Sequence, residues 1–567
     1  MNRVRLNFIV FIITLLFIIA VGRAFYIQII KHRYYFNQYI ENLSRNVVVK
    51  GYRGEIFDAD HRALAISYPS FELFVDPVFF NRLNEKYGDD PLFEFKKDAF
   101  FEDLETVLSL KKRYVLGVIN KYKSLRFVIL KRNITLNQFR KLKYNPNFLR
   151  SFGFVKNYKR FYPDGEFSAH IVGFCYRGYK NGEGAEGLER YYNKYLEAPV
   201  LKERVFFDNL KTQTSIAPKG GDKLTTTINK DIQDFVHIAL KDTVLKHQAK
   251  SGMVVVMNPF DGSIIAMDSY PFYNNNFFYK FKYSDIRNRC ITDVFEPGSV
   301  FKVVTMSAAL DSGVFKGNEI IYCNKGRYKI KNKVIHDVHR FKYLSFDNVF
   351  VYSSNIGSAK IALKLGKKLF YKYLYKFGVG FKTGVDLNGE AEGIVKDIFN
   401  VGDVDLATMA FGQGIGVTEI QLARIYSAIA NGGYLVRPHF MKSLISDSQA
   451  IRYKLEKHRI LKPSTVEKVK SILRKVVLYG TGKRAALKDY NVAGKTGTAQ
   501  IAFRGEYQHE YVASFAGFAP FKKPRFVVVV SIFKPQKGGI YGGEVAAPLF
   551  AKIMDYALHY YGVKPNK

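Results

Sequence analysis

The longest apolar stretch of the chain lies at its N-terminus, where residues 6–22 carry no charge and only Asn7 and Thr14 are polar. This stretch is near the lower length limit of a helix that spans a membrane. The residues after it stay apolar and offer no small-x-small cleavage site, which favours an uncleaved signal-anchor over a cleaved signal peptide. We therefore expect a cytoplasmic tip over residues 1–5 and a transmembrane anchor over residues 6–24. The rest of the chain would lie on the periplasmic side of the cytoplasmic (inner) membrane, because long domains are translocated whatever their charge.

Two folded units are expected after the anchor, because 567 residues exceed the size of one domain. Short strand-like runs alternate with charged, aromatic-rich helical segments as far as a Lys-Gly-Gly-Asp boundary signal at residues 219–222. The strand-like runs are at residues 47–49, 71–75 and 127–130. We therefore place one domain over residues 25–220 and a second over residues 221–567.

The second domain has a firmer pattern of strands and helices. It opens with a strand-like run, an amphipathic helical run and a β-hairpin pattern, at residues 224–228, 230–245 and 253–267. Four helical runs follow, at residues 300–310, 346–365, 419–430 and 464–478. The domain closes with two strands and a helix, at residues 492–501, 526–533 and 545–560. Strands on both sides of a helical block predict an α+β fold, in which one antiparallel sheet is assembled from both ends of the segment and packed by helices.

Charge and cysteine content narrow the function only slightly. The net charge of +37 could attract nucleic acid, anionic lipid or an acidic wall polymer. The absence of Trp beside 39 Tyr and 49 Phe favours a compositional bias at surface positions instead, and no nucleic-acid motif accompanies the charge. We therefore expect no nucleic-acid partner. The three cysteines, Cys175, Cys290 and Cys323, are too widely separated for a disulfide framework or a metal motif.

The most informative short motif is Ser-Val-Phe-Lys at residues 299–302, which follows a Glu-Pro-Gly turn signal and opens an apolar helical run. We expect Ser299 on the first turn of a buried helix, with Lys302 on the same face. A serine hydroxyl needs an adjacent base to act as a nucleophile, and a helix N-terminus offers free N–H groups to an anion. Alone, such a pair occurs by chance in any long lysine-rich chain.

Two partner motifs follow in order. Ser-Ser-Asn at residues 353–355 lies between two helical runs, 54 residues after the serine (353 − 299). Lys-Thr-Gly-Thr at residues 495–498 lies in a strand signal, 196 residues after it (495 − 299). Each motif alone is typical of a helix cap or a turn. Their order and settings match the S-x-x-K, S-x-N and K-T-G set of serine acyltransferases and related hydrolases.

The chemistry of acyl transfer explains these residue types. Ser299 would attack a carbonyl, and Lys302, kept neutral beside a second cation, would take its proton. Ser353 would relay a proton, and the Asn355 amide would hold both the base and a substrate amide. Lys495 would supply the positive charge that keeps Lys302 neutral and attracts an anionic substrate.

The third motif would also bind the substrate. The hydroxyls of Thr496 and Thr498 would hold a terminal carboxylate, and Gly497 would leave room for a peptide along the strand edge. The backbone N–H groups of Ser299 and Thr498 would form an oxyanion hole, a feature that contributes about 10²–10³-fold in rate per donor.

With these motifs the chain closely resembles the class B penicillin-binding proteins, which are peptidoglycan D,D-transpeptidases, and most of all their division-specific penicillin-binding protein 3 type. The resemblance covers nearly the whole chain and includes further segments in both halves. These are Arg53-Gly54 with Ile56 and Asp58, then Arg160-Phe161-Tyr162-Pro163, and residues 186–189, 287–289, 292–298 and 541–543. By this resemblance Ser299 is the acylated serine and Lys302 its base, and the other two motifs complete the site.

The resemblance also implies an architecture and a function. It implies a single N-terminal transmembrane helix, an elongated non-catalytic pedestal of the dimerisation type, and a penicillin-binding, β-lactamase-like transpeptidase domain with helices on both faces of an antiparallel sheet and a helical subdomain. The implied function is cross-linking of peptidoglycan stem peptides in septal wall synthesis, with β-lactams as inhibitors and with neither a cofactor nor a metal. The implied partners are a polytopic glycan polymerase and other division proteins.

One segment departs from the family pattern. After Arg53-Gly54 and Ile56, the family sequence in the pedestal reads Asp-Arg-x-Gly, whereas this chain has Asp58-Ala59-Asp60-His61. The departure concerns a turn and one contact in the pedestal and leaves the catalytic motifs untouched.

Three other motifs are set aside. Gly-Thr-Gly-Lys at residues 480–483 lacks the glycine spacing and the following Ser or Thr of a phosphate-binding loop. The glycines of residues 412–416 lack dinucleotide spacing, and we expect them to let a loop pass close to the site. His336 and His339 have no third ligand, which favours a surface or packing role over metal binding.

Two alternative functions remain. A D,D-carboxypeptidase or a β-lactamase-type serine hydrolase would share the catalytic motifs, but hydrolysis of a soluble antibiotic does not require a long pedestal. A non-catalytic division scaffold or a β-lactam sensor is disfavoured because every catalytic side chain is intact. A sensor would also be expected to carry further membrane segments and a cytoplasmic output module.

Overall fold

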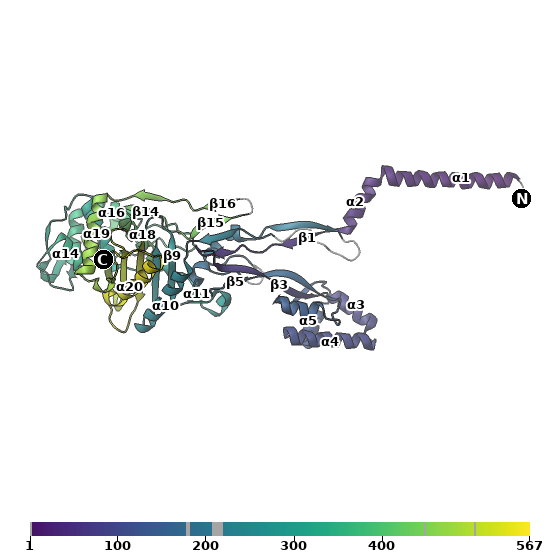
Figure 1. Ribbon diagram of the computed structural model, residues 1–567, viewed down its shortest axis with the longest axis horizontal. Coiled ribbons are helices and arrows are strands. Elements are labelled where there is room, and N and C mark those ends of the chain that lie inside the picture. The colour runs from purple at the N-terminus through teal and green to yellow at the C-terminus, as the bar shows by residue number, and fades with distance from the viewer. Residues whose placement is uncertain (1–2, 177–181, 207–218, 447–448, 504–505) are drawn as a thin grey trace. The chain divides into compact units, whose positions relative to one another are not determined.

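The computed structural model describes residues 3–176, 182–206, 219–446, 449–503 and 506–567 (Figure 1). The chain forms two compact units, one of Met1–Tyr52 with Ala198–Gly221 and one of Arg53–Glu197 with Asp222–Lys567. Each unit is therefore built from segments that are distant in the sequence.

The first unit contains the apolar N-terminal segment. Helix α1 (Arg3–Phe25) continues through a π-helical turn, η1 (Tyr26–Ile30), to α2 (His32–Leu43). Strand β1 (Ser44–Lys50) then pairs antiparallel with β6 (Val200–Phe206). In the described part of the chain, Arg3–Ile30 is the one helix long and apolar enough to cross a membrane.

The second unit begins with a mixed α+β region. Its strands are β2 (Ile56–Phe57), β3 (Ala63–Val75), β4 (Val128–Ile134) and β5 (Phe152–Phe161). Its helices are α3 (Pro77–Tyr87), α4 (Pro91–Leu108), α5 (Lys112–Lys121) and α6 (Leu136–Lys143). Asp76 and Asp90 cap α3 and α4, and each is followed by proline at the first helical position. These helices share a separate small core with the far end of β3, centred on Phe100 and Phe152.

Three pedestal segments singled out by the family resemblance meet at one buried carboxylate. Glu189, which is fully buried in the short helix α8 (Gly187–Tyr191), accepts hydrogen bonds from Arg160 Nε at 2.6 Å and from the guanidinium of Arg53. The two cations hold the pKa of Glu189 at about 2 against the opposing effect of burial. The nearby helices α7 (Ala169–Val172) and α9 (Asn193–Leu196) complete this region.

One seven-stranded sheet joins the pedestal to the C-terminal region. β2 pairs in parallel with β7 (Lys223–Thr226), which pairs antiparallel with β15 (Met441–Ile445). The strand order is β16-β15-β7-β2-β3-β4, with β5 also on β3 and β16 at Ala450–Arg452. The pedestal and the C-terminal region are therefore one continuous structure at this sheet.

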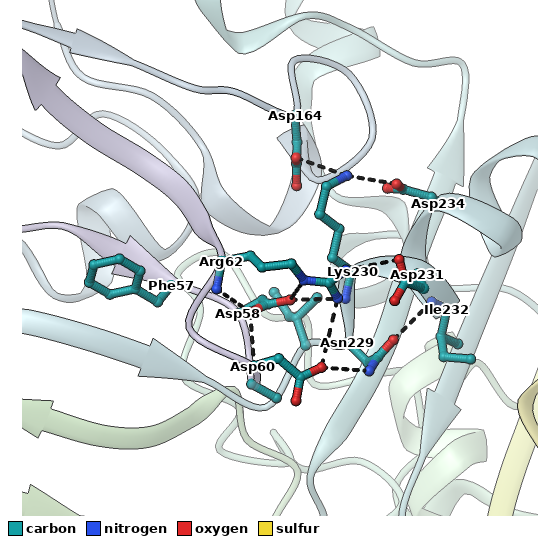
Figure 2. Close-up of polar contacts among 12 residues, drawn as sticks. Phe57, Asp58, Asp60, Arg62, Asp164, Asn229, Lys230, Asp231, Ile232 and Asp234 are labelled. Atoms are coloured by element: carbon teal, nitrogen blue, oxygen red, sulfur yellow. Dashed lines mark hydrogen bonds and ion pairs between the residues drawn. The ribbon is translucent and has the colours of Figure 1, made fainter. Parts of the chain in front are cut away.

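Charged groups surround the same junction (Figure 2). Asp58 is fully buried, and its Oδ2 accepts from Arg62 Nε at 2.8 Å, while Arg62 Nη1 reaches Asp231 Oδ1 at 2.9 Å. Lys230 lies between Asp164, at 3.0 Å, and a carboxylate of its own helix. Carboxylates from the pedestal and from the C-terminal region thus share two cations.

Residues 58–61, whose sequence differs from the family pattern, still form a tight turn. Asp58 N–H donates to the Arg62 carbonyl at 2.9 Å, and His61 has φ +62°. His61 therefore takes the left-handed conformation at the position where the family pattern has glycine. Arg62, three residues after Ala59, supplies the guanidinium contact to Asp58.

The main sheet of the C-terminal region is antiparallel, with the order β18-β19-β20-β8-β9. Its strands are β8 (Ser251–Met257), β9 (Ile264–Tyr270), β18 (Ala493–Phe503), β19 (Glu506–Ala519) and β20 (Phe526–Phe533). Helices α10 (Lys230–Lys246) and α20 (Gly542–Tyr560) share a core with one face. Helix α13 (Lys302–Asp311), helix α18 (Glu419–Ala430) and most of α19 (Pro463–Leu478) share a core with the other face. This confirms the predicted α+β sheet assembled from both ends of the segment.

A helical subdomain extends the core that α13, α18 and α19 share with the main sheet. Its helices are α14 (Phe346–Val351), α15 (Asn355–Leu365), α16 (Lys367–Lys376) and α17 (Asp403–Met409). Short strands border it: β10 (Ile320–Tyr322) with β13 (Tyr343–Ser345), β11 (Arg327–Ile330) with β12 (Lys333–His336), and β14 (Tyr434–Val436) with β17 (Lys457–Arg459). The remaining short helices are η3 (Asn275–Lys280), α11 (Tyr283–Ile286), α12 (Arg289–Thr292), η4 (Gly298–Phe301), η5 (Asn324–Gly326), η6 (Ile398–Asn400) and η7 (Lys483–Ala485).

Candidate active site

Ser299 lies in a tight helical turn. The turn η4 is a 3₁₀ helix that continues as α13 at Lys302. Side chains three residues apart eclipse in a 3₁₀ helix, so Ser299 and Lys302 lie on one side of the turn. Ser299 is half-buried, whereas Lys302 is fully buried. The serine is therefore the member of the pair that remains open to a substrate.

Glycines allow this turn to pack against a neighbouring loop. Gly298 has φ +58°, and its N–H donates to the Gly412 carbonyl at 3.1 Å. A Cβ at Gly412 would lie 2.2 Å from the Gly298 oxygen, closer than any side chain tolerates. The expectation that this loop passes close to the site is therefore confirmed at Gly412. From the core side, Tyr426 donates to the Val300 carbonyl at 2.8 Å and holds the turn in place.

Lys302 is a buried amine surrounded by oxygen atoms. Its Nζ lies 2.6 Å from the Ser353 carbonyl oxygen, 2.8 Å from Asn355 Oδ1 and 3.2 Å from Ser353 Oγ. Burial lowers the pKa of Lys302 well below its ordinary value, the charge of Lys495 lowers it further, and Asp337 opposes both effects. Burial and the charge of Lys495 therefore both favour the neutral form of the Lys302 amine, and burial contributes more than the second lysine does.

Ser353 joins the two lysines. Lys495 Nζ donates to Ser353 Oγ at 2.9 Å and to the Thr496 carbonyl at 3.2 Å. Burial lowers the pKa of Lys495 to about 7, so its charge is lost as the pH rises through neutrality instead of being fixed as the sequence suggested. Ser353 itself has φ +61°, an uncommon conformation for a residue with a side chain. The structure thus brings Lys302, Ser353, Asn355 and Lys495 into one hydrogen-bonded group.

Asp337 is a residue beside the site that the sequence motifs did not reveal. It lies directly after β12, and its carboxylate accepts from the backbone N–H groups of Asn355 and Ile356, at 2.6 and 3.0 Å. The Asn355 amide also donates to the carbonyl of His336 at 3.2 Å. The segment between His336 and His339, which was considered above for metal binding, therefore contributes to the site through Asp337.

The third motif lies on an edge strand. β18 pairs only with β19 in the described sheet, so one side of the strand can accept an extended peptide. A Cβ at Gly497 would lie 2.9 Å from the Pro297 carbonyl oxygen and 3.0 Å from a methyl group of Val300. The glycine is therefore required for the strand to pack against the nucleophile turn, whatever room it also leaves for a substrate.

The threonines of this motif are held by the protein. Thr496 Oγ1 lies 2.6 Å from Thr481 Oγ1, and Thr498 Oγ1 accepts from the backbone N–H of Gly542 at 3.0 Å. Thr481 belongs to the Gly-Thr-Gly-Lys segment that resembled a phosphate loop, and its position gives that segment a supporting role at the site. The side chain of Thr498 is thus held at the start of α20.

Metal-ligating side chains do not gather in the part of the chain that the structure describes, where no group of three His, Cys, Asp or Glu residues is arranged to hold an ion. The three cysteines are free and buried. Cys323 lies 3.6 Å from Ser354 Oγ at the rear of the site, and burial raises the pKa of its thiol.

Comparisons with known proteins agree with this geometry. The family model of the penicillin binding protein transpeptidase domain matches residues 252–555, and that of the penicillin-binding protein dimerisation domain matches residues 48–226. Together they cover both the pedestal strands and the three catalytic motifs.

Curated relatives match along almost the whole chain. The probable peptidoglycan D,D-transpeptidase PenA of Neisseria meningitidis serogroup A is 31% identical over 99% of this chain and 94% of its own length. The peptidoglycan D,D-transpeptidase FtsI of Escherichia coli K12 is 32% identical over 91% of this chain and 84% of its own length. The crystal structure of penicillin binding protein 3 from Mycobacterium tuberculosis complexed with aztreonam has a TM-score of 0.70 at 23% identity, covering 92% of this chain and 98% of that one. At this identity the structural match shows the fold.

Proposed function

Because the chain belongs to the penicillin-binding protein transpeptidase family, we propose that it is a peptidoglycan D,D-transpeptidase that cross-links stem peptides through an acyl-enzyme on Ser299. The observation that carries this proposal is the Ser353 hydroxyl within 3.2 Å of Lys302 Nζ and 2.9 Å of Lys495 Nζ, both of which are buried amines. Buried polar groups in this arrangement are a recognisable acid–base system.

Acylation would begin with proton transfer from Ser299 to Lys302. A neutral amine has two N–H groups and one lone pair, and the carbonyl oxygens of Ser353 and Asn355 take the N–H groups. The lone pair is then available to a hydroxyl proton. Ser299 Oγ attacks the penultimate D-Ala carbonyl, and the oxyanion that forms is held by the backbone N–H groups of Ser299 and Thr498.

Collapse of this intermediate would break the peptide bond and release D-Ala. The leaving amine takes the proton from Lys302 through the Ser353 hydroxyl. An amine of a neighbouring stem then attacks the acyl-enzyme, and its proton passes to Lys302. The ester bond to Ser299 Oγ breaks as the new peptide bond forms, and Lys302 returns the proton to Ser299 Oγ. A β-lactam would stop at the acyl stage, which agrees with the family to which the chain belongs.

The substrate would lie along the free side of β18. We assign its terminal carboxylate to the hydroxyls of Thr496 and Thr498 and to the charge of Lys495, with main-chain pairing to the strand. Gly497 keeps this strand against the nucleophile turn.

We further propose a single-pass protein of the inner membrane, anchored by residues 6–24, with the pedestal over residues 25–220 and the catalytic domain over residues 221–567 on the periplasmic side. The apolar helix at Arg3–Ile30 supports the anchor. The FtsI relatives support a role in division, in which a polytopic glycan polymerase and other division proteins would be the partners.

Labelling with a fluorescent penicillin tests the assignment. The wild type is expected to form a stable labelled species, and Ser299→Ala is expected to form none. Ser312→Ala, which removes a hydroxyl just after the C-terminal end of helix α13, is the matched control and should label normally. Equal labelling of wild type and Ser299→Ala would overturn the proposal. Rapid turnover of the bound penicillin would favour the hydrolase alternative instead.

A further inference from the structure

We propose that Asp337 is a positioning residue for acylation, which fixes the turn carrying Ser353 and Asn355 and places a negative charge behind Lys302. This rests on the proposed function, because it concerns the same acylation step. Asp337 lies outside the three catalytic motifs, and its carboxylate reaches them from the loop after β12.

The carboxylate is shared by three donors at the start of α15. Oδ1 accepts from the N–H groups of Asn355 and Ile356, and Oδ2 accepts from Ser354 Oγ at 2.6 Å. Ser354 Oγ in turn accepts from the Gly357 N–H at 2.9 Å. Asp337 and Ser354 together therefore satisfy free N–H groups of the first helical turn. A negative charge is also favoured at this end of a helix.

This cap holds the oxygen atoms that bind the general base. All three oxygens around Lys302 Nζ belong to the residues on either side of Ser354: the carbonyl oxygen and Oγ of Ser353, and Oδ1 of Asn355. Ser353 has φ +61°, a conformation that costs about 1 kcal/mol or more for a residue with a Cβ and needs support from its surroundings. The hydrogen bonds of Asp337 begin at the next residue, Ser354, and supply that support.

The orientation of the Asn355 amide is fixed by the same loop. Its Nδ2 donates to the His336 carbonyl, which can only accept, so Oδ1 must be the atom that faces Lys302. His336 and Asp337 thus hold the amide and the backbone of one residue from adjacent positions in the chain.

The charge of Asp337 acts on Lys302 against two other influences. Burial and the charge of Lys495 lower the pKa of Lys302, and Asp337 raises it. Among the other groups nearby, Cys323 stays a neutral thiol because burial raises its pKa. An amine whose pKa falls too far is a weak base. Asp337 would therefore preserve the basicity of an amine that burial has made neutral.

The sign of the expected pH effect follows directly. Neutral Lys302 is the active form, so acylation is lost as the pH falls through the pKa of Lys302. Removal of the negative charge at Asp337 lowers that pKa, so the loss moves to lower pH. We expect this shift to be measurable, because Asp337 binds the backbone of Asn355, the residue whose amide oxygen contacts Lys302.

The test is the pH profile of acylation by a fluorescent penicillin, measured on the full-length protein in detergent from about pH 4.5 to about pH 8. For Asp337→Asn we expect the acid limb to move to lower pH and the plateau rate to fall by about tenfold or more. Ser354→Ala disturbs the same cap but keeps the charge of Asp337. The plateau rate should therefore fall, while the acid limb should stay at the same pH. Asp405→Asn, at the start of α17, removes a carboxylate that also accepts a backbone N–H at a helix N-terminus, and it should leave both values unchanged.

An unmoved acid limb in Asp337→Asn would overturn the proposal, even if the plateau fell, because a merely structural residue would behave in that way. Asp337→Glu keeps the charge and covers the case in which the Asn variant does not fold. Its limb should not move to lower pH, and a shift equal to one caused by loss of charge would also overturn the proposal. Absence of Ser299-dependent labelling in the wild type would instead refute the proposed function.

Discussion

At the scale of single residues, the two buried lysines differ in their pKa values because their surroundings differ. Burial lowers the pKa of both lysines. The charge of Lys495 lowers the pKa of Lys302 further, whereas the pKa of Lys495 is lowered only to about 7. Lys495 therefore keeps part of its charge at neutral pH, while two influences, burial and the second cation, favour the neutral form of Lys302. The same desolvation that makes one lysine a base makes the other a titratable electrostatic group.

A bell-shaped pH profile is the first prediction from this difference. Acylation should be lost at low pH as Lys302 gains a proton, and lost again as the pH rises through about 7, where Lys495 loses its charge and its attraction for an anionic penicillin. Lys495→Arg keeps a charge that cannot be titrated. We expect the alkaline limb to disappear in this variant, with a lower plateau because the guanidinium does not fit the ammonium site. The measurement is acylation rate against pH, and an alkaline limb retained in the arginine variant would contradict the assignment.

Buried Glu419 gives a second prediction, on stability. Its carboxyl is fully buried, it accepts from Ser531 Oγ at 2.7 Å, and burial raises its pKa to about 8. The folded state therefore holds a proton that the unfolded chain releases at about pH 4.5. Stability should fall as the pH rises from about 4.5 to about 8, by up to ~1.4 kcal/mol per pH unit. Glu419→Gln should remove this pH dependence. The unfolding midpoint of the variant, relative to that of the wild type, should therefore rise as the pH is raised toward 8. Parallel midpoints across this range would show that the carboxyl is ionised in the fold.

At the scale of elements, contact between an edge strand and a helical turn sets the site. β18 carries the third motif, η4 carries the nucleophile, and they approach so closely that Gly497 has no room for a side chain. Gly497→Ala would push a methyl group toward the Pro297 carbonyl oxygen, which is rigid backbone. The strand and the turn must then separate.

We therefore expect Gly497→Ala to lower the acylation rate by about 10² or more, because small displacements of catalytic groups cost that much. The matched control is Gly117→Ala in α5, where a new Cβ meets no atom within 4 Å. That substitution should leave acylation unchanged and stabilise the helix by about 0.5–1 kcal/mol. Acylation by Gly497→Ala at the wild-type rate would show that the packing is looser than described.

The strands of the main sheet and the helices that cover its two faces could be predicted from the sequence, with the exception of strand β19. The helix at residues 419–430 matches α18 because its Thr418 cap and its apolar positions are local signals. β19 was missed, although it lies between β18 and β20. Its first half is polar and its buried half is rich in small residues such as Ala513, Ser514 and Gly517, which have low strand propensity. Pairing on both sides, which is not a local property, makes it a strand.

The candidate site shows the same limit. Ser299, Lys302, Ser353 and Lys495 could be found because short motifs keep them together, and the structure joins the last three by hydrogen bonds. Asp337 could not be found, because a single aspartate has no spacing rule and its partners lie 18 and 19 residues away in the chain.

At the scale of the whole molecule, the pedestal segment Arg53–Glu197 and the catalytic region are fused by a shared sheet and by the ionic cluster of Figure 2. Asp386 adds a third connection, because its carboxylate accepts from Tyr192 of the pedestal at 2.7 Å and from the N–H groups of Phe440 and Met441. We therefore expect these two regions to unfold in one transition.

Arg62 is the group whose loss should weaken this junction most. It is the cationic partner of the fully buried Asp58 and also contacts the more exposed Asp231. Arg62→Ala would leave Asp58 buried with backbone N–H donors but no cation, at a cost of about 1–3 kcal/mol. Asp231→Asn breaks only the exposed pair, which is worth about 0–1 kcal/mol.

Thermal unfolding of the full-length protein, with intrinsic fluorescence and fluorescent-penicillin labelling as separate probes, distinguishes these cases. Arg62→Ala should lower the midpoint clearly more than Asp231→Asn, and the two probes should still report one transition if the shared sheet alone holds the regions together. Separate transitions in Arg62→Ala would instead mean that the ionic cluster provides the coupling. Equal midpoints for the two variants would contradict the importance of the buried carboxylate, because the exposed pair is the one contact that both substitutions remove.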